Sequence, residues 1–247
     1  MWGVMSLVGC IDPVEDYPVI KKGVDYVKEK TQMFRSRGCR IEVPPSLNYV
    51  ITEHRFWEYG TAVELAWRHR LLHPIQERTK VVNIGCGWDA LSPALSCDGV
   101  FDITDCEPDE VCRNDRKKIN EVVISMGRHP IKILPNSVYE LPNESFDIVY
   151  CISVLEHVSN EGDAWLALTN RVSKDGMLFI TVDCVEHKNK SYACDGARQT
   201  NYTLDVLKER IEMVKKLGFK TIGEPDYVYH GAHVFDYTFF RVGFERI

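Results

Sequence analysis

The chain has 247 residues, of which 45% are hydrophobic and 27% are charged. These shares are ordinary for a folded globular protein and exclude a disordered, collagen-like or disulfide-scaffold chain. Lysine and arginine total 30 against 36 aspartates and glutamates, a formal net charge of −6, so there is no overall basic field for a phosphate backbone and nucleic acid is not expected as a partner.

The first third of the chain predicts helices. Residues 1–78 differ in their pattern of apolar residues from the rest of the chain. They predict a helical extension that caps a domain spanning residues 79–247. Within this extension, the lysine-rich stretch 17–34 has weak helical spacing. Residues 43–46 include two prolines, which cannot donate ladder hydrogen bonds, and predict a break. Residues 53–72 carry apolar side chains at intervals of three and four, which predicts an amphipathic helix.

That last helix contains Trp57, Glu58 and Tyr59 in succession. One interpretation is core packing of an aromatic stripe at helical spacing. The other is that the helix covers a cofactor cleft, with Trp57 and Tyr59 as flat walls and Glu58 as a polar contact. The sequence leaves both interpretations open.

From residue 80 on, apolar runs alternate with segments of helical spacing. Strands are predicted at 81–84, 100–104, 131–134, 146–152 and 177–182, with helices at 88–97, 108–123 and 162–172. Asp175 and Gly176 predict a turn before the fifth strand. Thr203 is typical of a helix N-cap and Gly218 of the end of that helix. The β-rich tail from residue 219 to 247 predicts a terminal pair of strands.

This alternation predicts an α/β fold, a doubly wound and mostly parallel sheet sandwiched by helices. Five strands followed by a terminal pair make a seven-stranded sheet. Ligands of such sheets bind at the carboxyl ends of the strands, where the winding reverses. Polar and glycine residues at strand ends are therefore the first candidates for a site.

Cysteine usage bears on compartment and metal binding. The chain has nine cysteines, and no two are spaced as Cys-x-x-Cys, so neither a zinc site nor a thioredoxin-like site is predicted. An odd number of cysteines in a chain of this length favours reduced thiols and a cytoplasmic location. Residues 1–10 lack the positive region of a signal peptide. No run reaches the roughly 18 apolar residues of a membrane span, so no membrane association is expected.

The first candidate site is Gly85-Cys86-Gly87, directly after a predicted strand. Glycines there let the backbone turn sharply and approach a ligand closely, although an ordinary strand-to-helix turn has the same appearance. Asp105 ends the next strand, 20 residues after Gly85, the distance at which a carboxylate can accept hydrogen bonds from a ribose diol. A nicotinamide dinucleotide and S-adenosylmethionine both fit this pair. The dinucleotide-binding pattern Gly-x-Gly-x-x-Gly has a third glycine at the position where this chain has Ala90.

Several motifs together resemble the class I S-adenosylmethionine-dependent methyltransferases, from about residue 80 to the C-terminus. The matching segments are Asn83-Ile84-Gly85-Cys86-Gly87, Asp105-Cys106-Glu107-Pro108, Asn136-Ser137 with residues 140–147, residues 151–158 and residues 175–180. The β-rich tail resembles the family's reversed terminal hairpin, which implies an antiparallel terminal strand. The resemblance implies S-adenosyl-L-methionine as cofactor, with contacts from Asn83, Gly85, Cys86, Gly87, Asp105, Cys106, Asn136, Ser137 and Ser153, to which we add Glu58.

Two positions depart from the family pattern beside the missing third glycine. Asn83 stands where members usually carry Asp or Glu, and Trp88 is large for a position beside the cofactor. These departures bear on cofactor affinity more than on the fold.

The resemblance implies transfer of the sulfonium methyl group, for which the protein aligns the acceptor and, for a hydroxyl, removes a proton. His157 is the first candidate base, because it follows the fourth strand and histidine titrates near neutrality; packing against the next helix is its alternative role. Asp183 is the second candidate. His187, His230 and His233 are interpreted as surface residues. A divalent metal held by His157, Asp183 and His187 is an alternative that their irregular spacing does not favour, and no metal is predicted.

The predicted function is therefore methyl transfer from S-adenosyl-L-methionine to a small-molecule or glycan-like acceptor, through oxygen. Helices resembling the one with Trp57, Glu58 and Tyr59 occur before the first motif in methyltransferases associated with glycan or secondary-metabolite pathways. The alternatives are a nicotinamide-dependent reductase and a catalytically inactive cofactor-binding subunit. The sequence makes no prediction of oligomeric state.

Overall fold

The computed structural model describes residues 8–10, 13–41, 49–74, 77–185, 202–223 and 238–247. The five strands predicted between residues 81 and 182 all fall within these ranges. The predicted break at 43–46 and the histidines 187, 230 and 233 lie outside the described residues.

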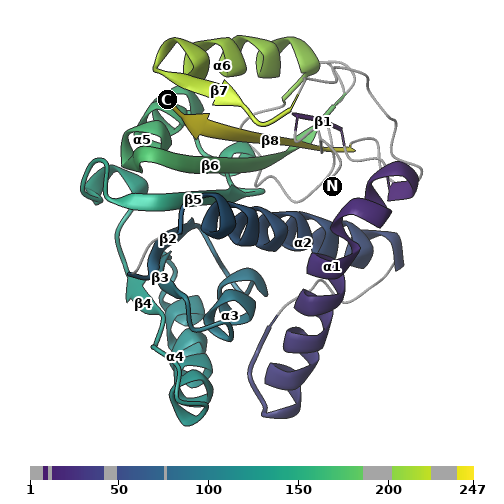
Figure 1. Cartoon of the computed structure of the whole chain (residues 1–247), viewed down its shortest axis with the longest axis vertical. Helices are drawn as coiled ribbons and strands as arrows, with labels where there is room; N and C mark the ends of the chain where they lie inside the picture. Colours follow the sequence, from purple (N-terminus) through teal and green to yellow (C-terminus); the bar gives the residue numbers. More distant parts are fainter. Residues whose placement is uncertain (1–7, 11–12, 42–48, 75–76, 186–201, 224–237) are drawn as a thin grey trace.

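One mixed sheet forms the centre of the molecule (Figure 1). Its strands are β1 (Val8–Cys10), β2 (Thr79–Ile84), β3 (Phe101–Cys106), β4 (Lys132–Leu134), β5 (Phe146–Ile152), β6 (Val172–Cys184), β7 (Phe219–Thr221) and β8 (Thr238–Arg246). The order is β1-β8-β6-β5-β2-β3-β4, with β7 also paired with β8. Strands β2 to β6 are parallel, and β8 runs antiparallel to β6, β7 and β1. The predicted seven strands and antiparallel terminal strand are confirmed, and β1 is an eighth strand that the sequence did not predict.

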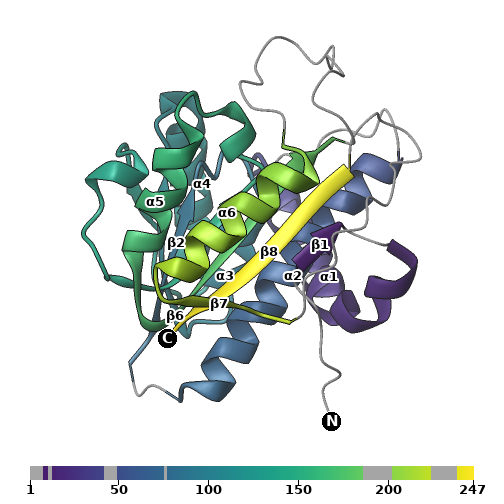
Figure 2. The same ribbon diagram turned by 90° about the horizontal axis from the view of Figure 1, so that it is seen from above.

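Helices cover both faces of this sheet. Their bounds are α1 (Pro13–Ser36), α2 (Tyr49–Leu72), α3 (Leu91–Ser96), α4 (Glu110–Ser125), α5 (Glu161–Arg171) and α6 (Leu204–Lys216), with 3₁₀ turns η1 (Val138–Glu140) and η2 (Leu155–His157). The helices α1 to α4 share one hydrophobic core, and α5 and α6 share another. Figure 2 shows α6 alongside β8. The described helices include none with the length and apolarity needed to cross a lipid bilayer.

Strand β5 shows why the sheet separates two cores. Ile148 and Tyr150 belong to the core on the side of α1 to α4, whereas Val149 and Cys151 belong to the core on the side of α5 and α6. Successive side chains of a strand point to opposite faces, so a strand buried on both faces must be apolar throughout. The apolar run at 146–152 therefore predicted the strand with its bounds.

The N-terminal helices pack on the sheet. α1 and α2 cross closely at Gly23 and Gly60, where a β-carbon on Gly23 would lie 2.2 Å from the Gly60 carbonyl oxygen. Ile20 and Val63 of these helices lie in the same core as Val81 of β2. The helical extension thus shares a core with the sheet, and the division at residues 78 and 79 stays a prediction.

Two local expectations have different outcomes. The hydroxyl of Thr203 accepts a hydrogen bond from the Val206 amide and caps α6, as predicted. The fifth strand, predicted to begin at Met177, begins at Val172, so the predicted turn at Asp175 is an irregularity inside β6 with a φ of +61°. Phe146 pairs with Val172 and Ile148 with Met177, so β6 has extra residues at this point and the register of the two strands shifts.

Candidate functional site

A cavity of about 210 Å³ lies at the carboxyl ends of β2 and β5. Its walls come from α2, the loop after β2 and the residues that end β5. The lining residues are Arg55, Tyr59, Gly85, Cys86, Trp88, Asp89, Ile152 and Ser153. Because β3 lies on one side of β2 and β5 on the other, the winding of the sheet reverses here, which is where open α/β sheets bind ligands.

The two loop glycines have different reasons to be glycine. Both have positive φ, +64° at Gly85 and +49° at Gly87, a region that residues with a β-carbon avoid. A β-carbon on Gly85 would lie 2.8 Å from the Val154 side chain, whereas one on Gly87 would meet nothing within 4 Å. The Val154 side chain therefore packs against Gly85, whereas Gly87 borders open space.

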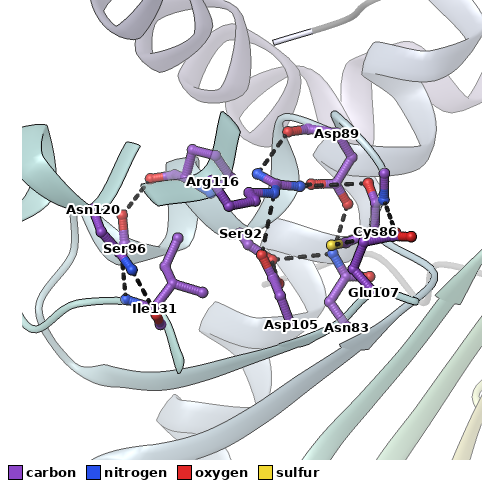
Figure 3. A network of polar contacts seen from close by, with 12 residues as sticks. Asn83, Cys86, Asp89, Ser92, Ser96, Asp105, Glu107, Arg116, Asn120 and Ile131 are labelled. Carbon is purple, nitrogen blue, oxygen red and sulfur yellow. Dashed lines mark hydrogen bonds and ion pairs between the residues drawn. The ribbon is translucent and has the colours of Figure 1, made fainter. Parts of the chain in front are cut away.

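A buried polar network lies behind the loop (Figure 3). The Asn83 amide donates to the Asp89 carboxylate at 2.6 Å and to the Ser92 hydroxyl at 3.0 Å. Arg116, 1% exposed, donates to the other Asp89 oxygen at 2.5 Å. Asp105 completes the group, since Arg116 Nε lies 3.3 Å from its carboxylate. A carboxylate at position 83 would face two others, which accounts for the amide in this chain.

The Asp105 side chain has no exposed surface. Its carboxylate accepts a hydrogen bond from the Ser92 hydroxyl, and burial raises the pKa of Asp105 to about 6, against the opposing effect of Arg116. The carboxylate that the sequence predicted for a ribose thus belongs to the network behind the loop. Its assignment as a ribose contact stays a prediction.

Glu107, two residues further on, lies at the loop itself. One oxygen of its carboxylate accepts from the Gly87 amide at 2.6 Å and the other from the Asp109 amide at 2.9 Å. The Cys86 sulfur lies 3.9 Å from the first oxygen. Glu107 belongs to the motif Asp105-Cys106-Glu107-Pro108 but was not predicted as a site residue. The second carboxylate in this motif is the sequence feature that could have identified it.

A second buried group joins α2 to the ends of β5 and β6. The Glu58 carboxylate accepts from the Ser153 hydroxyl at 3.0 Å and from the Thr181 hydroxyl. Its other oxygen accepts from Arg55 at 2.9 Å. Ser153 has a φ of +50°, a strained backbone for a residue with a side chain and one found mostly at functional sites. Glu58 thus contacts the cavity wall from within the core.

The turn η2 after β5 and the last residues of β6 bring two carboxyl groups together. Glu156 is 1% exposed and Asp183 is 6% exposed. The Asp183 amide donates to Glu156 at 3.4 Å. Burial, followed by the charge of Asp183, raises the pKa of Glu156 to about 8. Such a group exchanges protons near neutral pH.

The remaining predicted site residues have other surroundings. His157 is exposed on η2, whereas the other two residues of that turn, Leu155 and Glu156, are buried. Ser137 is exposed and forms the capping box of η1 with Glu140, and Asn136 before it is half-buried. Cys106 is buried and accepts the Gly85 amide through its carbonyl. None of these four predicted residues lines the described cavity.

Trp88 lies at the rim of the cavity. Its indole nitrogen donates to Asp115 at 2.7 Å, and the Arg40 guanidinium stacks 3.9 Å from the ring centre. The large side chain is therefore held from outside the loop by α4 and by the segment after α1. Among the residues that the structure describes, there is no group of three or more His, Cys, Asp or Glu side chains suited to a metal ion.

Residues 82–180 match a family model described as "Methyltransferase domain". The curated proteins that match include a ubiquinone biosynthesis O-methyltransferase of Rickettsia bellii (strain OSU 85-389), which is 25% identical over 116 residues. That alignment covers 46% of this chain and 45% of the relative. The match therefore spans about half the length of the curated relatives.

Solved structures share the fold at low identity. One is a protein of Galdieria sulphuraria provisionally described as a sarcosine dimethylglycine methyltransferase, with a TM-score of 0.60, 15% identity and coverage of 90% of this chain and 98% of that one. Another is magnesium protoporphyrin IX methyltransferase (ChlM) from Synechocystis PCC 6803 with bound SAM, with a TM-score of 0.56, 16% identity and coverage of 82% and 86%. At these identities the likeness is one of fold.

Proposed function

We propose that the chain is a class I, S-adenosylmethionine-dependent methyltransferase that methylates an oxygen of a small-molecule or glycan-like acceptor. The match of residues 82–180 to a methyltransferase domain supports methyl transfer. The Rickettsia relatives that match are O-methyltransferases by name, which supports oxygen as the acceptor atom. The observation that carries the proposal is the open space at Gly87 beside the Glu107 carboxylate, next to a cavity where the winding of the sheet reverses.

The residues around Gly87 fit an adenosyl group. Ribose hydroxyls donate well to a carboxylate. Glu107 is 5% exposed and its carboxylate is bonded to the Gly87 amide of the loop, whereas Asp105 has no exposed surface and contacts Ser92 and Arg116. We therefore assign the ribose contact to Glu107. Asn83 and Asp105 then act on the cofactor indirectly, by fixing the loop from behind. Glu107 thus replaces Asp105, its neighbour in the same motif, as the proposed ribose contact.

When bound, S-adenosylmethionine supplies an electrophilic methyl group on a sulfonium. The chain must align the acceptor and accept its proton as the oxygen–carbon bond forms and the carbon–sulfur bond breaks. Of the two predicted bases, Asp183 lies beside Glu156 at the ends of β5 and β6. We assign proton acceptance to this carboxyl pair, with the exposed His157 as the alternative.

Calorimetric titration of the protein with S-adenosylmethionine tests the cofactor, and transfer of a labelled methyl group to hydroxylated small molecules and glycans tests the reaction. Micromolar binding with label appearing on an oxygen supports the proposal. Binding without transfer to any acceptor favours the inactive-subunit alternative. Stabilisation by NADH in place of S-adenosylmethionine favours the reductase alternative.

A further inference from the structure

The two oxygens of the buried Glu156 carboxyl group have different surroundings. Oε1 accepts a hydrogen bond from the Asp183 amide at 3.4 Å. Oε2 is enclosed and makes no hydrogen bond with any described residue. A buried carboxylate needs donors for both of its oxygens, whereas a protonated carboxyl group is neutral and loses less when it leaves water. The geometry therefore favours a proton on Oε2.

The charged and titratable side chains that face Glu156 favour the same state. Asp183 of β6 and Glu58 of α2 oppose a negative charge on Glu156, and Arg55 of α2 supports one. Arg55 already donates to Glu58 at 2.9 Å, so its charge is shared. The Cys151 thiol of β5 also faces Glu156, and burial raises the pKa of that thiol, so it brings no positive charge. Of two carboxyl groups that share a buried site, one keeps its proton.

Asp183 is the better placed member of the pair to carry the negative charge. It is the more exposed of the two, at 6% against 1% for Glu156, so it loses less hydration as an anion. Aspartate is also the stronger acid of the two residue types. Burial and the charge of Asp183 together raise the pKa of Glu156 to about 8. At neutral pH the proton therefore stays on Glu156, and the Asp183 carboxylate is able to accept another.

We propose that Glu156 is a positioning residue for the base Asp183: it stays protonated during the reaction, and its neutrality keeps Asp183 in place as the single negative charge of the pair. This inference rests on the proposed function, because Asp183 acts as a base only if the chain methylates an oxygen. In that step the acceptor hydroxyl gives its proton to Asp183 as the oxygen bonds to the methyl carbon. The electron pair of the carbon–sulfur bond stays on sulfur, and Glu156 keeps its own proton.

Infrared difference spectroscopy tests the charge division without turnover, because a protonated carboxyl group has a carbonyl stretching band that a carboxylate lacks. The difference between wild type and Glu156→Gln at pH 6.5 should contain one such band, which disappears with a midpoint at about pH 8. The difference between wild type and Glu110→Gln, an exposed control, should contain none. Glu156→Met takes the place of Glu156→Gln if circular dichroism shows that the glutamine variant is unfolded.

Coupling to Asp183 is tested in the same way. In an Asp183→Asn background the midpoint of the Glu156 band should fall by about one pH unit or more, because a negative neighbour has been removed. An unchanged midpoint, or the absence of the band from wild type at pH 6.5, overturns the inference and leaves the proposed function standing.

The pH profile of turnover tests the positioning role. Above about pH 8 the second carboxylate repels Asp183, so kcat of the wild type should fall about tenfold per pH unit. In Glu156→Gln, which cannot ionise, the ratio of kcat at pH 9 to kcat at pH 7 should stay within about twofold of one. A fall that persists in this variant overturns the positioning role. A wild type that shows the infrared band but methylates no acceptor overturns the proposed function and the base role with it, whereas the division of charge stands.

Discussion

The backbone amide of Gly87 donates a hydrogen bond to the Glu107 carboxylate at 2.6 Å. This contact joins the loop after β2 to the segment after β3, and it places a negative charge beside the open space at Gly87. The same loop is fixed from behind by the Asn83, Asp89 and Arg116 network. A rigid loop with a carboxylate held against its backbone is an arrangement that suits an adenosyl ribose.

The first prediction separates the roles of Glu107 and Asp105. Glu107→Gln should weaken S-adenosylmethionine binding about tenfold, because a neutral amide is a poorer acceptor for ribose hydroxyls than a carboxylate. Calorimetry measures this loss, and Glu110→Gln, an exposed residue at the start of α4, is the matched control. Equal affinity of Glu107→Gln and wild type would remove Glu107 from the ribose contact.

Asp105→Asn should act on folding instead. The substitution removes one carboxylate from a buried network with Arg116 and Ser92, so the free energy of unfolding at pH 7 should change by about 1–3 kcal/mol. Urea denaturation measures the change. A tenfold loss of cofactor affinity in a variant of unchanged stability would instead restore Asp105 as the ribose contact.

The second network prediction concerns Asn83. Asn83→Asp creates the acidic residue usual in the family, but here it adds a third carboxylate beside Asp89 and Asp105. We expect a loss of about 1–3 kcal/mol in the free energy of unfolding at pH 7. The loss should be smaller at pH 5, where more of these carboxyl groups are protonated. A variant as stable as wild type at pH 7 would contradict this explanation of Asn83.

Glu156 predicts a pH dependence of stability. Its pKa rises from an ordinary value of 4.5 to about 8 on folding, so the folded state binds more protons than the unfolded chain between these values. Its contribution is fully present below pH 4.5 and is lost as the pH rises through 8, at roughly 1.4 kcal/mol per pKa unit. Denaturation at pH 5, 6.5 and 8 should show this decline in wild type and a flatter profile in Glu156→Gln. Parallel profiles would mean that Glu156 titrates normally.

The assignment of the base is tested by turnover. With an acceptor that accepts label, Asp183→Asn should lower kcat by about 10²- to 10⁴-fold, the usual worth of general base catalysis, with cofactor binding unchanged. His157→Asn should change kcat by less than about threefold, because His157 is exposed and lies outside the buried pair of Glu156 and Asp183. The opposite result would return the base role to His157.

Local patterns predicted most of the fold. The apolar run 146–152 and the Thr203 cap each depend on neighbouring residues alone, and both are confirmed. Strand β1 has three residues and exists through pairing with β8, more than 200 positions away, so no local pattern marked it. The bulge at Asp175 likewise depends on the partner strand β5.

The site was predicted to the level of motifs and less well to the level of side chains. Spacing located the ends of β2 and β3. It could not tell that Glu107 contacts the Gly87 amide while Asp105 contacts Ser92 and Arg116, because these contacts depend on how the loop after β2 and the helices α3 and α4 pack on β3. Glu58 contacts Ser153 and Thr181, which are 95 and 123 positions away. Its inclusion rested on the interpretation that its helix covers a cofactor cleft, whereas its contacts with Ser153 and Thr181 required the tertiary structure.

A crystal structure with S-adenosylhomocysteine bound tests the account most directly. We predict the ribose hydroxyls within hydrogen-bonding distance of the Glu107 carboxylate. A ligand whose ribose contacts Asp105 after the buried network has opened, or one bound elsewhere on the molecule, would contradict it.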